Sequence, residues 1–273
     1  MTSSMNTKMT ATPEPTLRRY SLGEGVVAFS TTRHGGYSHG NHGSFNVNEY
    51  CGDDPLAVAN NRGLLCRELG IGEERLVMPH QTHGVEVRQI AGEFMALPPS
   101  TRKMLLEGVD AVMTDVERVC VGVSTADCMP ILLYDPCHRA CCAVHAGWRG
   151  TVAHIAARAV AAMAAAYHTE PSALRACIGP GISLEHFEVG DEVYGLFADA
   201  GFDMDKVARR HGKWHIDLWE CNRIELCLAG LQPASVSVEG PCTYSHADDY
   251  FSARRLGTAS GRIFTGIMID KSQ

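Results

Sequence analysis

A cysteine and a histidine stand at the two ends of a short, mostly apolar stretch in the middle of the chain. Cys128 lies in the sequence Ala-Asp-Cys-Met-Pro, and His145 opens the glycine-bounded sequence His-Ala-Gly-Trp-Arg-Gly. Thiolate and imidazole are ligands that suit zinc or copper. A histidine can equally take the thiol proton and make the cysteine a nucleophile. A third interpretation is that both are ordinary buried residues, because the chain has 11 cysteines and 13 histidines.

The elements around these two residues would bring them together. Residues 131–134 and 140–144 are continuous apolar runs separated by turn residues, which is typical of two buried neighbouring strands. Cys128 comes just before the first run, and His145 comes just after the second. If the strands form an antiparallel hairpin, both side chains lie at its open end. We therefore predict that they are near neighbours in space.

Other residues could complete such a site. His83, in the sequence Gln-Thr-His-Gly, precedes a strand-like alternation, and His80 is an equal candidate by composition. Arg33 follows a predicted strand at 26–31 and begins a glycine-rich stretch in which backbone could approach a ligand closely. Arg149 precedes an alanine-rich segment, 151–167, that predicts a helix with its positive dipole end near His145.

The late segment 250–255 could return a further arginine, Arg255, to the site. For each of these arginines, a solvated surface side chain is the alternative interpretation. We add Asn46, from the glycine-rich stretch, to the candidate residues for binding substrate or phosphate.

Composition limits the classes of function. The 273 residues are 45% hydrophobic and 20% charged, and the net charge of -7 provides no basic stripe for a nucleic acid. Neither a signal peptide nor a membrane-length apolar run is visible, and an odd number of cysteines cannot all pair within the chain. We expect a cytoplasmic protein with a small-molecule partner, a disordered tail at 1–16 and one domain at 17–273.

Further elements follow from periodicity and capping. Helices are expected at 56–69, at 190–200 and from the cap Asp217 to 228. Strands are expected at 109–114 and 119–124, as a pair, and at 235–239 and 263–269.

Six motifs occur in the order typical of one known family. The chain resembles the YfiH-like or laccase-domain family over about residues 26–269, through segments 31–36, 81–84, 126–130, 145–150, 178–180 and 251–255. The resemblance implies an α/β (α+β) protein, a single domain of mixed β-sheets packed between helical layers. It also implies that His83, rather than His80, joins Cys128 and His145 as the metal-binding and catalytic triplet.

Members of this family are described as zinc-dependent purine nucleoside phosphorylases acting on adenosine, inosine and S-methyl-5′-thioadenosine, with adenosine deaminase as a second activity. The resemblance therefore implies a purine nucleoside and phosphate as partners. Three protein ligands would leave a zinc position open, as catalytic sites require. For phosphate we expect Arg33, Arg149 and Arg255.

Three alternatives remain at this point. The pair Cys128 and His145 could serve a hydrolase, including an editing factor acting on peptidoglycan precursors. A binding module would keep the metal without catalysis. A copper-dependent polyphenol oxidase fits less well, because a multicopper enzyme needs many histidine ligands and the chain offers one compact triplet, although copper binding remains open.

Overall fold

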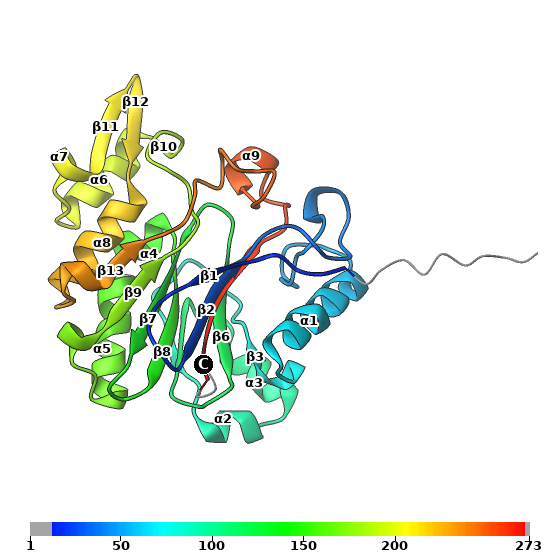
Figure 1. Ribbon diagram of the computed structural model, residues 1–273. Coiled ribbons are helices and arrows are strands. Elements are labelled where there is room, and N and C mark those ends of the chain that lie inside the picture. The colour runs from blue at the N-terminus through cyan, green and yellow to red at the C-terminus, as the bar shows by residue number, and fades with distance from the viewer. Residues whose placement is uncertain (1–12, 271–273) are drawn as a thin grey trace, which may run out of the picture.

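The computed structural model describes residues 13–270, and its layers are two stacked β-sheets with helices on both outer faces (Figure 1). One sheet has the strand order β1-β2-β14-β6-β3, and the other has the order β13-β9-β7-β8-β5-β4. The first comprises β1 (Leu17–Tyr20), β2 (Val26–Thr31), β14 (Ile263–Ile269), β6 (Cys120–Thr125) and β3 (Leu76–Val77). The second comprises β13 (Val236–Val238), β9 (Arg175–Ile178), β7 (Met129–Asp135), β8 (Ala140–Ala146), β5 (Ala111–Thr114) and β4 (Val87–Gln89).

Both sheets are mixed, because each contains parallel and antiparallel neighbours. A small third sheet has the order β10-β12-β11 and projects at the top of the view in Figure 1. It comprises β10 (Glu188–Val189), β12 (Lys213–Ile216) and β11 (Ala208–His211). The predicted fold class, mixed sheets between helical layers, is confirmed.

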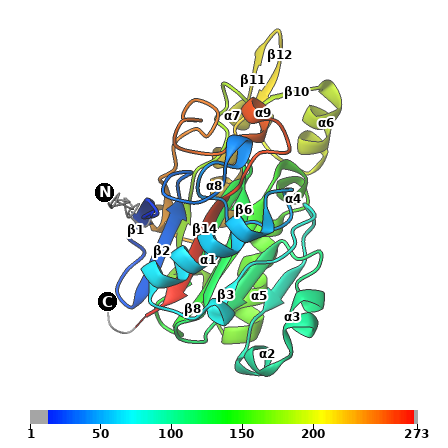
Figure 2. The ribbon, with the colours of Figure 1, turned by 90° about the vertical axis from the view of Figure 1, so that its right-hand side faces the viewer.

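Helices cover the outer faces of the two large sheets. α1 packs on the five-stranded sheet, and α4, α5 and α8 pack on the six-stranded sheet (Figures 1 and 2). These four helices are α1 (Pro55–Leu69), α4 (Trp148–Val152), α5 (Ile155–Tyr167) and α8 (Leu218–Leu228). The other helices are α2 (Gly92–Ala96), α3 (Pro99–Leu105), α6 (Asp191–Asp199), α7 (Met204–Val207) and α9 (Ala253–Leu256). None of the helices described here is both long and apolar enough to cross a bilayer.

The central hairpin shows why its two strands read as continuous apolar runs. Ile131 and Leu133 of β7 contribute to the core beneath α5, whereas Leu132 and Tyr134 contribute to the core between the two large sheets. A strand buried on both faces needs apolar side chains at successive positions rather than at alternate ones. The pairing of β7 with β8 is antiparallel, as predicted.

Two predictions about elements are wrong. β5 and β6 do not pair: β5 pairs with β4 and β8, whereas β6 pairs with β3 and β14 in the other sheet. The alanine-rich segment is not one helix, because His154 has a φ of 61° and separates α4 from α5. α4 begins earlier than expected, at Trp148.

The predicted N-terminal tail falls largely on residues 1–12, which lie outside the described residues. Its last residue, Thr16, lies against the fold, since its carbonyl accepts hydrogen bonds from the backbone N–H and the Oγ1 of Thr32.

Candidate metal centre and its cavity

The open end of the β7–β8 hairpin carries Cys128 and His145. Pro130 is the register partner of His145, so Cys128 precedes β7 beside the end of β8. At the closed end of the hairpin, the Asp135 carboxylate accepts the backbone N–H groups of Cys137 and His138 and fixes the turn. The predicted proximity of Cys128 and His145 is confirmed.

His83 arrives on a loop that two side chains hold. The Gln81 amide bonds both backbone groups of Ser124 in β6, donating to the carbonyl at 2.8 Å and accepting the N–H at 2.7 Å. His83 itself has a φ of 63°, a conformation that non-glycine residues rarely adopt and that needs support from its surroundings.

That support comes from Asp110, which is fully buried. Its carboxylate accepts the backbone N–H groups of Thr82, His83 and Gly84 at 3.2, 3.0 and 2.7 Å. The same carboxylate lies 2.7 Å from Nδ1 of His145. One buried acid therefore orients both histidines, and the bond to Nδ1 leaves Nε2 of His145 free to bind a ligand.

The resulting cluster fits a metal ion. The ligand atoms of His83, Cys128 and His145 lie within 4.8 Å of one another. Two imidazoles and a thiol form a donor set that suits zinc or copper, and three protein ligands leave a coordination position for another molecule. His145 is 3% exposed, Cys128 is half-buried and His83 is exposed, so the cluster opens to solvent on the His83 side.

The charges of the cluster are coupled. Burial would raise the pKa of the Cys128 thiol, but His145 and then His83 lower it to about 6. Burial would lower the pKa of His145, whereas Cys128 and Asp110 raise it to about 9. For Asp110, burial is opposed by the hydrogen bond to His145 and by backbone N–H groups, and the net effect lowers its pKa. The protein without metal thus holds a thiolate beside an imidazolium, the form of cysteine that binds metals.

This coupling predicts a reactive thiol when the metal is removed. In chelated protein at pH 7, Cys128 should react with iodoacetamide, and its rate should fall as the pH falls through about 6 because the thiolate becomes protonated. Peptide mass spectrometry after timed labelling measures the rate at Cys128. One equivalent of zinc should suppress the reaction, and labelling that zinc leaves unchanged would contradict a metal site at this cysteine.

Gly147 leaves room for the cluster. A Cβ atom at this position would lie 3.0 Å from Sγ of Cys128 and 3.0 Å from Cδ2 of His83. We expect Gly147→Ala to lower zinc affinity by about 10-fold or more, since it displaces two ligand side chains. Gly190→Ala is the matched control, because Gly190 is the N-cap of α6 and a Cβ atom there would meet open space. Competition with a fluorescent chelator measures both affinities, and equal affinities would refute the crowding argument.

A cavity of about 330 Å³ adjoins the cluster. Besides the metal ligands, its lining includes Asn48, Tyr50 and Cys51 and the segment just before β14. The lining residues are Asn48, Tyr50, Cys51, His80, Gln81, His83, Ser124, Thr125, Ala126, Cys128, His145, Ala253, Thr258 and Arg262. Its volume is in the lower part of the range of small-molecule sites.

The arginines predicted from sequence are not among these lining residues. Arg33 donates to the carbonyls of Gly43 and Ala247, and it stacks over a phenylalanine ring. Arg149 is exposed and lies over the Trp148 ring, with 4.2 Å from Cζ to the ring centroid. Arg255, also exposed, donates to the carbonyl of Tyr244. The cationic side chain that lines the cavity in the described part of the chain, histidines apart, is Arg262, which the sequence reasoning missed.

Asn46 and His80, the other two candidates from the sequence, lie near the cavity but outside the ligand cluster. Asn46 is fully buried behind the cavity wall, where its Oδ1 accepts the backbone N–H groups of Asn48 and Arg262. His80 lines the cavity but is outside the ligand cluster, because its Nδ1 pairs with Glu107 at 2.7 Å and its ring stacks on Tyr50.

Comparison with known proteins gives consistent matches along the whole domain. The family model described as multi-copper polyphenol oxidoreductase laccase matches residues 27–270. The chain is 46% identical to a protein of Bacteroides thetaiotaomicron named purine nucleoside phosphorylase, over 90% of this chain and 92% of that protein. It is 42% identical to adenosine deaminase RL5 from an unknown prokaryotic organism, over 89% and 94% of the two chains. Its structure resembles that of YlmD from Geobacillus stearothermophilus, with a TM-score of 0.85 and 31% identity over 92% and 94% of the two chains.

Proposed function

Since the chain belongs to the multi-copper polyphenol oxidoreductase laccase family, whose relatives carry the names purine nucleoside phosphorylase and adenosine deaminase, we propose that it is a zinc-dependent purine nucleoside phosphorylase. Its substrates are adenosine, inosine and S-methyl-5′-thioadenosine, and adenosine deamination is a side activity. The observation that carries this proposal is the cluster of His83, Cys128 and His145 on the wall of a small-molecule cavity.

The donor set and the orienting carboxylate support zinc at this cluster. Bound there, zinc would supply Lewis-acid polarisation of a substrate atom and would lower the pKa of water. The chain's own residues do the remaining work: His83 and His145 are held by Asp110, and Gln81 fixes the loop that presents His83. Because these contacts are all between groups of the protein, they hold the two histidines in defined orientations.

Phosphorolysis makes two demands on the rest of the cavity. An oxygen of phosphate forms a bond to C1′ of the ribose while the bond from C1′ to N9 of the purine breaks, and the purine takes the electron pair and a proton. The phosphate must therefore be held beside C1′, and the departing base must receive hydrogen bonds. Amide and hydroxyl groups of Asn48, Gln81 and Ser124 lie in the lining of the cavity.

Deamination is the second activity favoured by an observation, because a relative that is 42% identical is named adenosine deaminase. It requires water at C6 of adenine and no phosphate, so the two reactions would place different atoms of the substrate near the metal.

A hydrolase that uses Cys128 as nucleophile, acting for example on a peptidoglycan precursor, is the alternative for the same residues. The description of the family names copper, but the described residues hold a single cluster of three ligating groups. A cytoplasmic location and the absence of nucleic-acid and membrane partners stay predictions.

Product analysis tests the proposal. Protein of known metal content is incubated with adenosine in the presence and absence of phosphate, and adenine, ribose 1-phosphate and inosine are separated by chromatography. The proposal predicts adenine and ribose 1-phosphate in equal amounts, only with phosphate. Inosine alone would make the protein a deaminase, and no turnover with one zinc per chain would refute both activities.

A further inference from the structure

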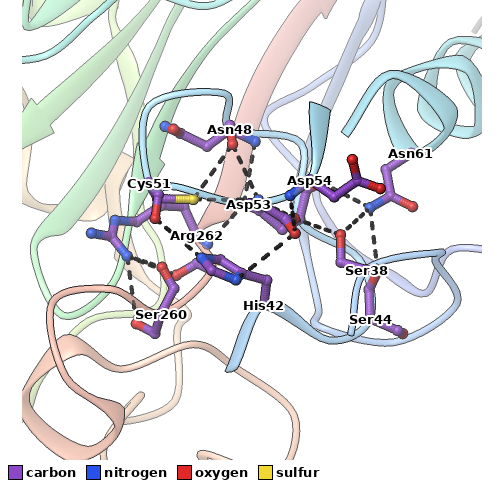
Figure 3. Close-up of polar contacts among 12 residues, drawn as sticks. Ser38, His42, Ser44, Asn48, Cys51, Asp53, Asp54, Asn61, Ser260 and Arg262 are labelled. Carbon is purple, nitrogen blue, oxygen red and sulfur yellow. Dashed lines mark hydrogen bonds and ion pairs between the residues drawn. The ribbon is translucent and has the colours of Figure 1, made fainter. Parts of the chain in front are cut away.

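Arg262 is a half-buried guanidinium without a carboxylate partner. It forms no ion pair within 4.0 Å among residues 13–270. Its terminal nitrogens instead donate to backbone carbonyls of Thr258, Ser260 and Gly261, which fixes the plane of the guanidinium. Figure 3 shows Arg262 beside Ser260. Burying a cation without a counter-ion is costly, so a group in this setting favours an anionic ligand.

The cavity that Arg262 faces would not repel an anion. Among the described residues its lining contains no aspartate or glutamate, and its other wall carries the metal ligands. A bound metal ion would add further positive charge on that side. An anion inside the cavity would therefore share its lining with Arg262 and with the metal ligands, and with no carboxylate among the described residues.

A second polar group beside Arg262 also lacks a partner. Thr125 is 1% exposed and lines the cavity, and its Oγ1 has no hydrogen-bond partner within the described chain. Thr125 is the register partner of Ile263, so Arg262 and Thr125 stand at adjacent ends of β14 and β6. Buried hydroxyls are rarely left without a partner, and a bound ligand would supply one.

The wall behind Arg262 is built to keep it in place. Its backbone N–H donates to Oδ1 of Asn46 at 3.1 Å, and Nδ2 of Asn46 donates to Asp53 at 2.8 Å. Oδ2 of Asp53 also accepts the hydroxyl of Ser38 at 2.6 Å, and Nδ1 of His42 lies 3.8 Å from Oδ1 of the same residue (Figure 3). This network joins the glycine-rich stretch, the 46–53 loop and the start of β14, so contacts within the protein fix the backbone that carries Arg262.

We propose that Arg262, together with the hydroxyl of Thr125, forms an oxyanion subsite in this cavity and binds orthophosphate. The role of this anion as co-substrate rests on the phosphorylase function proposed above, whereas its binding does not. The assignment replaces the arginines expected from sequence, because none of those three lines the cavity.

Binding is tested first, by isothermal titration calorimetry of the zinc-loaded protein with inorganic phosphate. Arg262→Gln should weaken binding about 10- to 100-fold, since it removes charge-assisted hydrogen bonds, and Arg262→Lys should weaken it less. Thr125→Val keeps the shape of the side chain and should weaken binding about threefold to 10-fold. Arg67→Gln, on the exposed face of α1, is the matched control and should bind as the wild type does. Zinc content and thermal unfolding show which variants are folded.

Kinetics then separate this proposal from the proposed function. With adenosine fixed, Arg262→Gln should raise the KM for phosphate about 10-fold or more, whereas the control Arg67→Gln should leave the KM for phosphate as in the wild type. If wild-type protein binds phosphate through Arg262 but releases no base, the phosphorylase function fails and the subsite stands.

Three results would overturn the subsite. One is unchanged phosphate affinity in folded, zinc-loaded Arg262→Gln and Arg262→Lys. Another is loss of phosphate binding in Arg149→Ala or Arg255→Ala but not in the Arg262 variants. The last is that binding of adenosine 5′-monophosphate depends on Arg262 whereas binding of orthophosphate does not. Arg262 would then contact a substituent of the nucleoside rather than free phosphate.

Discussion

Replacing Cys128 with alanine should abolish metal binding and phosphate-dependent release of adenine together. The side chain provides the one thiolate of the cluster, and its pKa of about 6 keeps it ionised at neutral pH. Loss of a residue that merely orients a ligand lowers metal affinity or activity about 10- to 100-fold, so loss of the thiolate itself should exceed about 100-fold. Metal analysis after dialysis and an initial-rate assay measure the two effects on the same sample.

Cys137→Ala is the matched control, because this cysteine is exposed in the turn between β7 and β8. The control should keep one zinc per chain and wild-type activity. Retention of adenine release in metal-free Cys128→Ala would contradict the proposed site. Retention in Cys128→Ala that still holds zinc would show that the thiolate is dispensable.

Asp110→Asn should have the next largest effect. The substitution keeps the volume but leaves one acceptor oxygen for four donors, namely three backbone N–H groups and Nδ1 of His145. We expect zinc affinity to fall about 10- to 100-fold. We also expect the free energy of unfolding to fall by about 2–4 kcal/mol, since buried donors are left without an acceptor. Chelator competition and urea denaturation measure these quantities.

The loss of stability should depend on pH in a defined direction. The folded state lowers the pKa of Asp110, so this carboxylate stabilises the protein above the unfolded value of about 3.9. The stabilisation disappears as the pH falls below that value through the folded pKa. The difference in the free energy of unfolding between wild type and Asp110→Asn should therefore be largest at pH 6–7 and decrease towards pH 3. Asp115→Asn, at an exposed position directly after β5, is the control variant, and equal effects in both variants would contradict the role of Asp110.

The central hairpin could be predicted because its signal is local. Two apolar runs bracketed by Pro130 and His145, with a turn at Asp135, specify both the strands and their open end. The pairing of β5 with β6 was predicted wrongly for the opposite reason. A short connection suggests a hairpin, but here it carries the chain from one sheet to the other, and periodicity does not report which sheet a buried strand joins.

The site shows the same division between local and long-range information. Cys128 and His145 follow from the hairpin, and the choice of His83 over His80 followed from the family motif. Asp110 was not identified from the sequence, because it lay inside the strand expected at 109–114 and its four donors come from two distant segments.

Arg262 was missed because its importance depends on a contact between strand ends far apart in the chain, Thr125 in β6 and Ile263 in β14. Arg149 was expected near the site from its position in sequence. The turn into α4 exposes it instead, and its guanidinium lies over Trp148.

The central claim is that one metal ion at His83, Cys128 and His145 supports phosphorolysis, and a reconstitution experiment tests it most directly. Protein freed of metal by a chelator is titrated with zinc, and phosphate-dependent release of adenine is measured at each addition. We predict a rate that rises in proportion to zinc and reaches a plateau at one equivalent per chain. Full activity in the metal-free protein, or activity that appears only with several copper ions per chain, would contradict the account.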